Sequence, residues 1–451
     1  MPVLPTIATH AATLQSRQIS SVELVKACLK RINAPDGEGD LAFVHVDADQ
    51  ALAAAAASDR LRAAGIMLSP LMGLPVSVKD LFDIAGQVTR AGSRVLAEAP
   101  AATKDATCIA RLRRAGAIPI GRTNMTEFAY SGLGLNPHYG TPASPYDRTT
   151  RRIPGGSSSG AGVSVADQMA VFGIGTDTGG SVRIPAALCN LTGFKPSTGR
   201  VPTAGVLPLS TTYDSVGPLA PSVACCVTVD QVMTDQPTTP LVPRPLNHLR
   251  LAIPTGIAME GLDNHVATAF ARAAKKLEAA GAHIQDVQID AITDPSRPGN
   301  GGRLLAAEAY AWHRHYLEAS YDMYDPRVSG RMMPASETSA ADYIALLGWR
   351  RQFLQDVAQT LTPYDALILP TTPITAPPIS LLEESEDAYF ANNVLMLRNT
   401  SIINQIDGCA LSIPCHAPNE PPVGFMLAGT AMQDQQILQS GLSVESVLRA
   451  L

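Results

Sequence analysis

The sequence predicts an α/β fold in which helices cover both faces of a largely parallel or mixed β-sheet. Short apolar runs alternate with helical patterns along most of the chain, as in proteins built on such a sheet. Charged residues make up only 16% of the 451 residues, so much of the chain is expected to be buried. A soft prior of about 150 residues per domain gives about three domains. Large α/β enzymes often remain one compact unit, however, and we expect a single domain over residues 1–451.

The first half of the chain supplies most of the expected elements. Ser20 and Glu23 form a capping box, which starts a helix that runs through Leu29. Apolar runs predict strands at 73–82, 117–121 and 171–176. Helical patterns predict helices at 47–64, 104–115, 124–131 and 160–169, and a further helix from about Ser181. Residues 132–160 are rich in Gly, Pro and Ser and predict a long loop.

The second half mixes strand signals with a long helical stretch. Residues 234–248 are rich in Pro and Thr and indicate a linker. A strand at 249–253 and a helix at 263–281 follow, and strand character returns at 365–375 and 408–415. Between them, residues from about 295 to 350 carry few strand signals and several aromatic side chains. We expect this segment to be a variable helical lid over the core.

Composition and charge exclude several function classes. A formal net charge of -6 and a pI near 5.9 argue against nucleic-acid binding, which needs clustered Lys and Arg. The seven cysteines are scattered without any C-x-x-C spacing, so neither a disulfide framework nor a zinc site is expected. The beginning of the chain lacks the pattern of a signal peptide, and no apolar run is long enough to cross a membrane. These features favour a cytoplasmic protein.

Two glycine-serine segments are candidates for chemistry. They are PGGSSSGAG at 154–162 and GTDTGGSVRIPA at 175–186, and each places serine at a loop-to-helix junction. Backbone N–H groups are unpaired at a helix N-terminus and can hold an anion, including the oxyanion of acyl transfer. Taken alone, each segment is about equally well explained as a tight turn with a serine helix cap. Neither has the lysine and hydroxyl residue of a phosphate-binding loop.

The segment GSSSG at 156–160 also fits the G-x-S-x-G pattern, with Ser158 at its centre. That pattern marks the nucleophile of α/β-hydrolases, where the serine directly follows a strand and a histidine comes later in the chain. Six histidines lie downstream, so the order is possible. The preceding run HYGTPASPYDRTTRRIPG cannot be a strand interior, and the hypothesis is therefore disfavoured.

Lys79 is a candidate base for a nucleophilic serine. It lies in the apolar run PVSVKDLF, where burial would lower the pKa of the ammonium group and leave a neutral amine able to accept a proton. The alternative is an ordinary ion pair with Asp80 or Asp83, and spacing alone does not decide between the two. No S-x-x-K motif occurs, which excludes the serine-lysine enzymes of the penicillin-binding type.

These motifs together resemble the core of the amidase signature family. GGSSSG is followed by GTDTGGSVRIPA, and Ser157 and Ser181 are 24 residues apart, as in that family. Further matches run in family order from about residue 70 to 430, with the core motifs at about 70–225 and 365–430. They are GLPVSVKD (73–80), TNMTEFAYSGLGLNP (123–137), GFKPSTGRVP (193–202), DSVGPLAPSV (214–223), LILPTTP (367–373) and PVGFMLAG (422–429). The resemblance implies the amidase signature fold, with a mixed sheet flanked by helices.

The resemblance also implies a role for each matching residue. Ser181 would be the nucleophile, Ser157 a bridging serine preceded by a cis peptide bond, and Lys79 the general base. The backbone N–H groups of the nucleophile loop would form the oxyanion hole, and two charged residues would hold the loop in shape. The oxyanion-hole residues are Thr178, Gly179, Gly180 and Ser181, and the supporting residues are Asp177 and Arg183. No metal or organic cofactor is required by this chemistry.

Family substrates suggest a small amide or carbamate, cleaved through an acyl-enzyme intermediate. The apolar character of the expected pocket favours an uncharged, partly hydrophobic substrate. The predicted pocket residues are Met125, Phe128, Tyr130, Gly132 and Leu133, joined by aromatic and methionine side chains of the lid. Arg303 and Arg331 are the candidates for holding a carboxylate, although neither has an obvious placement for it.

Rival functions are a urethanase or an esterase and, from other classes, a catalytically inactive scaffold or the glutaminase component of a tRNA-dependent amidotransferase. Components of that kind usually have Gln where this chain has Ile184, which counts against the last. The lysine and both serines are intact, which counts against an inactive scaffold. We expect a monomer or homodimer that acts on a small molecule and has no nucleic-acid or membrane partner.

Overall fold

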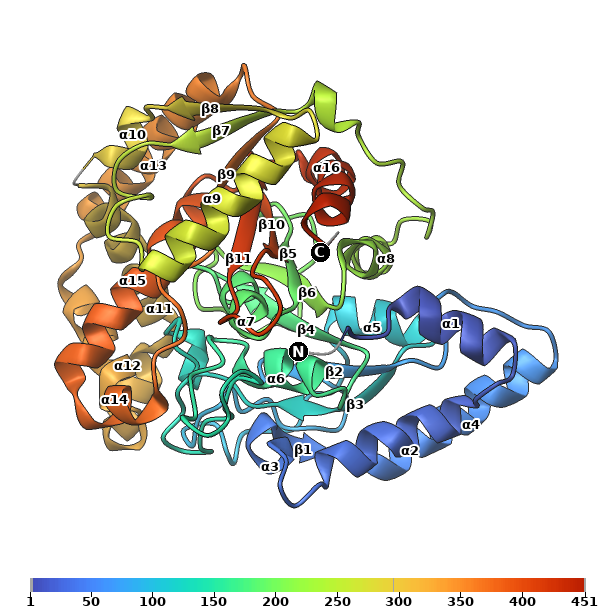
Figure 1. Cartoon of the computed structure of the whole chain (residues 1–451). Coiled ribbons are helices and arrows are strands. Elements are labelled where there is room, and N and C mark those ends of the chain that lie inside the picture. Colours follow the sequence, from blue (N-terminus) through green and yellow to red (C-terminus); the bar gives the residue numbers. More distant parts are fainter. Residues whose placement is uncertain (1–2, 295, 450–451) are drawn as a thin grey trace.

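The computed structural model describes residues 3–294 and 296–449; the expected lid begins at Pro295, which lies outside these ranges. The described residues form a mixed sheet of 11 strands in the order β1-β3-β2-β4-β6-β5-β10-β11-β9-β7-β8. The strands are β1 (Phe43–Val46), β2 (Pro75–Lys79), β3 (Ile118–Thr123), β4 (Phe172–Asp177), β5 (Thr192–Lys195), β6 (Ser215–Ala220), β7 (Arg250–Pro254), β8 (His283–Val287), β9 (Ala366–Pro370), β10 (Cys409–Pro414) and β11 (Gly424–Gly429). The sheet runs through the centre of the molecule with helices around it (Figure 1).

Helices account for about half of the remaining chain. They are α1 (Ile7–Gln15), α2 (Ser21–Ile32), α3 (Gly39–Ala42), α4 (Ala48–Ala63), α5 (Thr107–Arg114), α6 (Ser159–Ala166), α7 (Arg183–Leu188), α8 (Val223–Met233), α9 (Asn264–Ala279), α10 (Asp290–Thr293), α11 (Arg297–Ser320), α12 (Pro326–Met332), α13 (Ala340–Leu361), α14 (Ile379–Glu384), α15 (Glu386–Gln405) and α16 (Asp434–Leu448). Short 3-10 turns lie at Glu127–Ala129, Leu246–His248, Tyr321–Met323 and Met333–Glu337.

The helices form a layer on each face of the sheet, which confirms the predicted α/β fold. Helices α5, α8, α9 and α16 contact the strands from one side, and α4, α6, α7 and α15 contact them from the other. Separate hydrophobic clusters lie under the two layers. Because helices cover both faces of the sheet, each central strand buries side chains on both of its faces. Apolar runs dominate the central strands for this reason.

Strand β2 shows how this layering positions a functional side chain. It lies between β3 and β4 and is parallel to both. Side chains alternate along a strand, so Val76 and Val78 belong to the apolar cluster on one face. Ser77 lies on the opposite face, where its hydroxyl oxygen accepts a hydrogen bond from Ser164 of α6 at 2.8 Å. Lys79, two residues further on, ends the strand on this α6 side.

The helix predicted at 124–131 is wrong. Only a 3-10 turn at Glu127–Ala129 forms there, with φ angles of 48° at Phe128 and 62° at Ala129. Ala129 N and Tyr130 N donate to the nearby carbonyls of Thr126 and Glu127, but other backbone N–H groups of this segment donate to distant carbonyls. Thr126 N donates to Ser157 O at 3.1 Å, and Phe128 N donates to Ala91 O at 2.9 Å. Tertiary hydrogen bonds therefore replace the helix that the local sequence favours.

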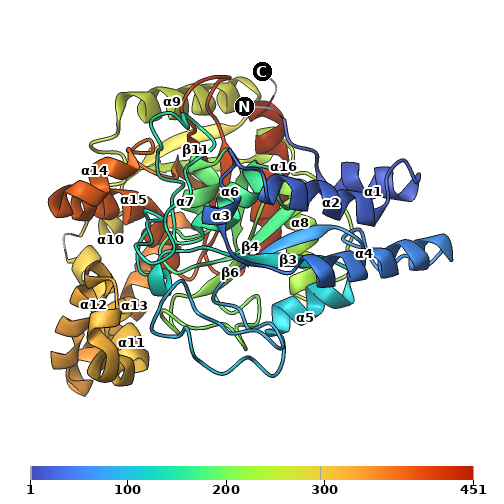
Figure 2. The same cartoon turned by 90° about the horizontal axis from the view of Figure 1, so that it is seen from below.

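The predicted lid consists of α11, α12 and α13 with their connecting turns. Figure 2 shows these helices gathered at one end of the molecule, while α1, α2 and α4 project at the other end. Helix α11 contacts both α12 and α13. The segment is thus helical throughout, as its lack of strand signals predicts.

Candidate active site

Lys79 ends β2 as a fully buried side chain with two hydroxyl neighbours. Its Nζ lies 2.8 Å from Ser157 Oγ and 2.9 Å from Thr176 Oγ1. Burial lowers the pKa of Lys79 to about 7, and the carboxylates of Asp214 and Asp177 oppose this shift. A substantial fraction of the lysine is therefore a neutral amine at neutral pH.

The ion-paired alternative for Lys79 does not hold. Asp80 forms an ion pair with Arg122, whose Nε lies 2.6 Å from the carboxylate. Asp83 accepts a hydrogen bond from the Thr89 hydroxyl at 2.7 Å. The two acids that follow Lys79 in the sequence are thus engaged elsewhere, which leaves the amine to face the hydroxyl groups.

Ser157 lies in the loop between β3 and α6, and the Gly156–Ser157 peptide bond is cis. Its neighbour Ser158 is fully buried, and the Ser158 hydroxyl donates to the carbonyl of Thr176 at 3.4 Å. No strand of the sheet lies among residues 132–156, which the structure describes in full. Ser158 therefore lacks the strand-to-helix turn that a G-x-S-x-G nucleophile requires.

Ser181 lies in the turn between β4 and α7. Gly180 precedes it with φ of 138°, and a Cβ there would come within 2.2 Å of Thr400 Oγ1, so only glycine fits. The backbone N–H of Ser158 donates to the Ser181 carbonyl at 3.3 Å, which joins the two glycine-serine loops. Within the described residues, no hydrogen bond joins the Ser157 and Ser181 hydroxyl groups.

The turn around Ser181 presents backbone donors without protein acceptors. Val182 N and Arg183 N donate to Asp177 Oδ2 at 3.1 and 3.3 Å. By contrast, the N–H groups of Gly179, Gly180 and Ser181 donate to no acceptor in the described part of the chain. Such groups at the start of a helix can stabilise a developing oxyanion.

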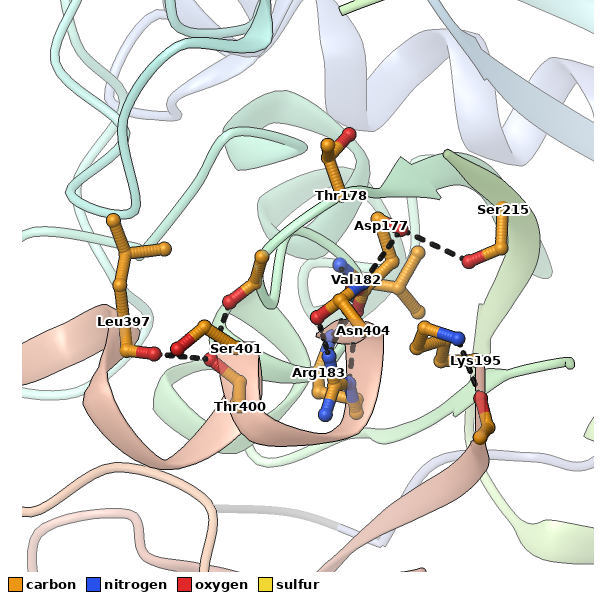
Figure 3. A network of polar contacts seen from close by, with 12 residues as sticks. Asp177, Thr178, Val182, Arg183, Lys195, Ser215, Leu397, Thr400, Ser401 and Asn404 are labelled. Carbon is orange, nitrogen blue, oxygen red and sulfur yellow. Dashed lines mark hydrogen bonds and ion pairs between the residues drawn. The ribbon is translucent and has the colours of Figure 1, made fainter. Parts of the chain in front are cut away.

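A buried polar network supports this turn. Arg183 and Asp177 form an ion pair in which Nη2 and Oδ1 are 2.8 Å apart, and both side chains are fully buried. Asn404 of α15 donates to the Asp177 carbonyl at 3.0 Å and accepts from Arg183 Nη2 at 2.7 Å (Figure 3). The guanidinium of Arg183 holds the pKa of Asp177 well below its usual range despite burial. Sequence reasoning identified Asp177 and Arg183 but missed Asn404, which lies more than 200 residues away in the chain.

Asp214 connects the turn to the loop that precedes β6. It accepts from the Thr178 hydroxyl at 2.5 Å and from Leu209 N at 2.9 Å. Burial raises the pKa of Asp214 to about 6, although its hydrogen bonds and the charge of Lys79 oppose the shift. Its place in the motif DSVGP is the only signal in the sequence that could have singled it out.

A cavity of about 400 Å³ opens beside the turn, lined by Thr178, Gly179 and Ser181. Of the five pocket residues predicted from the sequence, only Tyr130 lines this cavity. Met125, Phe128 and Leu133 are buried in the hydrophobic core, and Gly132 N donates to Asn393 Oδ1 at 2.9 Å. Periodicity cannot separate core from pocket in an irregular segment, because both positions demand apolar side chains.

The lid contributes cationic and not aromatic side chains to this cavity. Arg297 and Leu305 of α11 and Arg331 of α12 line it, and Arg398 of α15 lies across from them. Three of the aromatic lid side chains that the sequence places among the pocket residues, Tyr310, Trp312 and Tyr343, line a different surface cavity. Arg303 lies within 3.9 Å of Asp342 and does not line the cavity beside Ser181. Sequence reasoning therefore anticipated Arg331 and missed both Arg297 and Arg398.

Other candidate chemistries find little support in this region. No histidine lines the cavity, and no group of three or more potential metal-ligating side chains comes together among the described residues. All seven cysteines are buried free thiols. Across residues 3–294 and 296–449, helices that could cross a bilayer are absent.

Comparison with known proteins places this fold and site in one family. The profile of the family described as Amidase matches residues 23–438. The 2-amino-5-chloromuconic acid deaminase of Comamonas testosteroni is 33% identical to the chain, over 98% of this chain and 96% of the deaminase. The A component of the glutamyl-tRNA(Gln) amidotransferase from Chloroflexus aurantiacus is also 33% identical, over 97% of this chain and 95% of that component. A crystal structure of an amidase superimposes with a TM-score of 0.88 at 29% identity, covering 98% and 99% of the two chains.

These matches define the class of the protein as an α/β enzyme that hydrolyses carbon–nitrogen bonds. The chain belongs to the amidase signature family. It is a hydrolase of carbon–nitrogen bonds other than peptide bonds, as members of this family are.

Proposed function

We propose that this enzyme hydrolyses a small amide through a Ser181–Ser157–Lys79 triad and an acyl-enzyme intermediate. The observation that carries the proposal is the buried Lys79 amine, 2.8 Å from Ser157 Oγ and close to the loop that places Ser181 in a cavity. A neutral amine in this position accepts a proton, and no histidine or carboxylate lines the cavity beside Ser181 to serve instead.

The proposed reaction runs as a proton relay. Lys79 takes the proton of Ser157, and Ser157 takes the proton of Ser181 while Ser181 Oγ attacks the substrate carbonyl. The Ser157–Ser181 contact of this relay forms in the substrate complex, since catalytic hydrogen bonds often tighten only when substrate is bound. The relay then returns the proton to the departing nitrogen, the amine leaves, and an ester to Ser181 remains. Water attacks this ester by the same relay and releases the acid.

The oxyanion hole in this proposal consists of backbone N–H groups from Thr178 to Ser181. Three of them, at Gly179, Gly180 and Ser181, donate to no protein acceptor in the described residues, so they are available for substrate. Each donor of this kind is worth about 3 kcal/mol in the transition state. Asp177, Arg183 and Asn404 hold the turn so that these groups point the same way.

Carbamate and ester substrates are the nearest alternatives, because the same relay serves all three carbonyl compounds. A matched anilide, aryl carbamate and aryl ester with one acyl group would rank them by kcat/KM. A higher kcat/KM for the carbamate or the ester than for the anilide, after correction for leaving-group pKa, would replace the amide proposal.

An amidotransferase component is a second candidate, because the A component of one such enzyme is 33% identical to this chain. Ammonia release by the purified chain alone, together with its mass in solution by light scattering, tests this candidate. Turnover by a monomer or homodimer supports an independent hydrolase. Activity that appears only when a partner protein is added would favour the amidotransferase.

The acyl-enzyme itself is tested by covalent trapping. A fluorophosphonate probe should label one serine, and peptide mass spectrometry should map the label to Ser181. The label should be lost in Ser181→Ala and slowed in Lys79→Met. Labelling at Ser158 would contradict the triad and restore the G-x-S-x-G hypothesis.

A further inference from the structure

The cavity beside Ser181 is unusually rich in unpaired positive charge. Arg297, Arg331 and Arg398 line it, and its lining contains no Asp or Glu. None of the three forms an ion pair within the described residues. The chain as a whole carries a formal net charge of -6, so this concentration of cations runs against its overall balance. Unpaired buried cations are costly and point to an anion that completes the site.

Arg331 already has partners. Its Nε donates to the Arg327 carbonyl at 2.9 Å, and Nη2 donates to the Tyr130 carbonyl. Its guanidinium also lies over the Tyr130 ring, 4.3 Å from the centroid. Arg331 is therefore held against the wall of the cavity by the Tyr130 ring and two carbonyls, and only its Nη1 lacks a partner in the described residues.

In contrast to Arg331, neither Arg398 nor Arg297 lies over an aromatic ring in the described part of the chain. The Nε of Arg398 donates to Asn399 Oδ1 at 3.2 Å, but its Nη2 is buried without a hydrogen-bond partner in the described part of the chain. Arg297 is almost fully buried; its Nε donates to the Ile292 carbonyl at 3.1 Å and its Nη1 to Gln405 Oε1 at 2.8 Å. Each guanidinium thus meets only neutral acceptors and retains at least one terminal nitrogen for a ligand.

The two guanidinium groups also repel each other. Burial, and then the charge of Arg398, lower the pKa of Arg297 to about 10, while Asp294 opposes the shift. Burial likewise lowers the pKa of Arg398, with Glu260 opposing. Asp294 and Glu260 are exposed and do not line the cavity, so neither neutralises the pair. Both groups remain protonated at neutral pH and would share one anion favourably.

We propose that Arg398 and Arg297 bind a carboxylate of the substrate, so that the enzyme acts on amides that also carry an acid group. This inference rests on the proposed function and specifies its substrate class. A planar carboxylate matches the fork of a guanidinium better than other small anions do. Under this proposal the substrate is a monoamide of a dicarboxylic acid, in place of the uncharged substrate expected from the apolar side chains of residues 124–138 and of the lid.

The test compares matched substrates in the wild-type enzyme. Malonamate, succinamate and glutaramate each carry one amide and one carboxylate, and butanamide is the neutral control. At least one of the three acids should show kcat/KM about tenfold or more above that of butanamide. A wild-type enzyme that prefers butanamide to all three acids would overturn the proposal.

Variants then locate the binding group. Arg398→Met and Arg297→Met should each lower the ratio of kcat/KM between the best acid and butanamide by about 10- to 100-fold, chiefly through KM. Arg398→Lys, which keeps the charge without the fork, should fall between. Arg303→Met, on the same helix as Arg297 but directed toward Asp342, is the control and should leave the ratio unchanged. Equal losses on acid and neutral substrates would assign a structural role to these arginines and contradict the proposal.

A binding measurement separates this inference from the hydrolase proposal. Glutarate has no amide bond that the enzyme could hydrolyse. Calorimetry with the Ser181→Ala variant should detect glutarate binding. Arg398→Met in the same background should abolish that binding. If no amide is hydrolysed but glutarate binds and depends on Arg398, the proposed function fails and the carboxylate site stands. If amides are hydrolysed but glutarate does not bind, the carboxylate site fails and the hydrolase stands.

Discussion

The turn that carries Ser181 and the lid formed by α11, α12 and α13 border the same cavity but are held in place differently. In the turn, Asp177, Arg183 and Asn404 are fully buried or nearly so, and each pairs with the others. In α13, by contrast, only Leu346, Phe353, Val357 and Leu361 of 22 residues are buried. The turn is fixed by buried directional hydrogen bonds, whereas α13 has only a few buried apolar side chains and is held in addition by a partly buried hydrogen bond from Tyr343.

One polar cluster links the two regions. Glu308 of α11 accepts from Ser210 Oγ at 2.5 Å and from Tyr343 of α13 at 2.8 Å. Ser210 belongs to the loop that also donates to Asp214 and so reaches the Ser181 turn. Under the proposed function, the groups that act on the substrate are therefore held rigidly, while the segment proposed to select the substrate can shift more freely. Substitutions in each region test this difference between the turn and the lid.

Ser181→Ala is expected to give the largest effect, a loss in kcat of about 10⁴-fold or more with an unchanged melting temperature. The reason is that the Ser181 hydroxyl lies in the turn beside the free backbone donors. Ser158→Ala is the matched control, because that hydroxyl is buried against the Thr176 carbonyl. The control should keep activity within about tenfold, and the reverse pattern would move the nucleophile to Ser158. Initial rates and thermal unfolding measure both.

Lys79→Met should lower kcat by about 10²- to 10⁴-fold, the usual contribution of a general base. Lys195 is the control, since it is equally buried but donates to the carbonyls of Pro196 and Gly408 at 3.0 and 2.5 Å. Lys195→Met should cost about 1–3 kcal/mol of stability by leaving these carbonyls unpaired, while folded molecules remain active. Chemical denaturation measures the stability of the two variants, and initial rates measure their activity. Similar stability losses in both would mark Lys79 as structural.

The pH dependence of kcat/KM should show an acidic limb that reflects the pKa of Lys79. Because only the neutral amine accepts a proton and its pKa is about 7, kcat/KM should rise about tenfold per pH unit below 7 and level off above it. Asp214→Asn removes a negative charge that raises this pKa, so the limb should move to lower pH. Asp286→Asn, an exposed change on β8, should leave the limb in place. A limb that moves to higher pH in Asp214→Asn would contradict the assignment.

Glu308→Ala should give the smallest effect, a rise in KM of about three- to tenfold with kcat changed less than about threefold. It removes the acceptor shared by Ser210 and Tyr343 and loosens the lid without touching the turn. Hydrogen exchange should quicken in α13 and stay slow in β2 and β4. Glu318→Ala, at an exposed position of α11, is the control. A fall in kcat that matches the rise in KM would show that lid and turn act as one unit.

The helices and strands were predictable where the local residue pattern matches the burial of the side chains in the structure. The strands at 73–82, 171–176 and 408–415 correspond to β2, β4 and β10, and the helix predicted at 263–281 corresponds to α9. Strands β1, β5, β6, β8 and β11 were missed. β1 and β5 have only four residues each, β8 is largely polar, and β5, β6 and β11 contain glycine, which weakens a strand signal. The helix expected at 124–131 failed because the backbone N–H groups of Thr126 and Phe128 pair with distant carbonyls, which no local pattern can reveal.

The amino-acid sequence alone revealed local features, namely a lysine in an apolar strand and two serines in glycine turns. Local residue type and spacing decide backbone freedom and burial tendency, so these features can be read without coordinates. Only the tertiary structure decided which partner Lys79 meets, since Asp80 pairs with Arg122 and leaves the amine beside Ser157. It alone also brought Asn404 to Asp177 and two arginines, about 100 residues apart in the chain, to one cavity. Charge interactions depend on distance in space, and that distance is set by packing between elements remote in sequence.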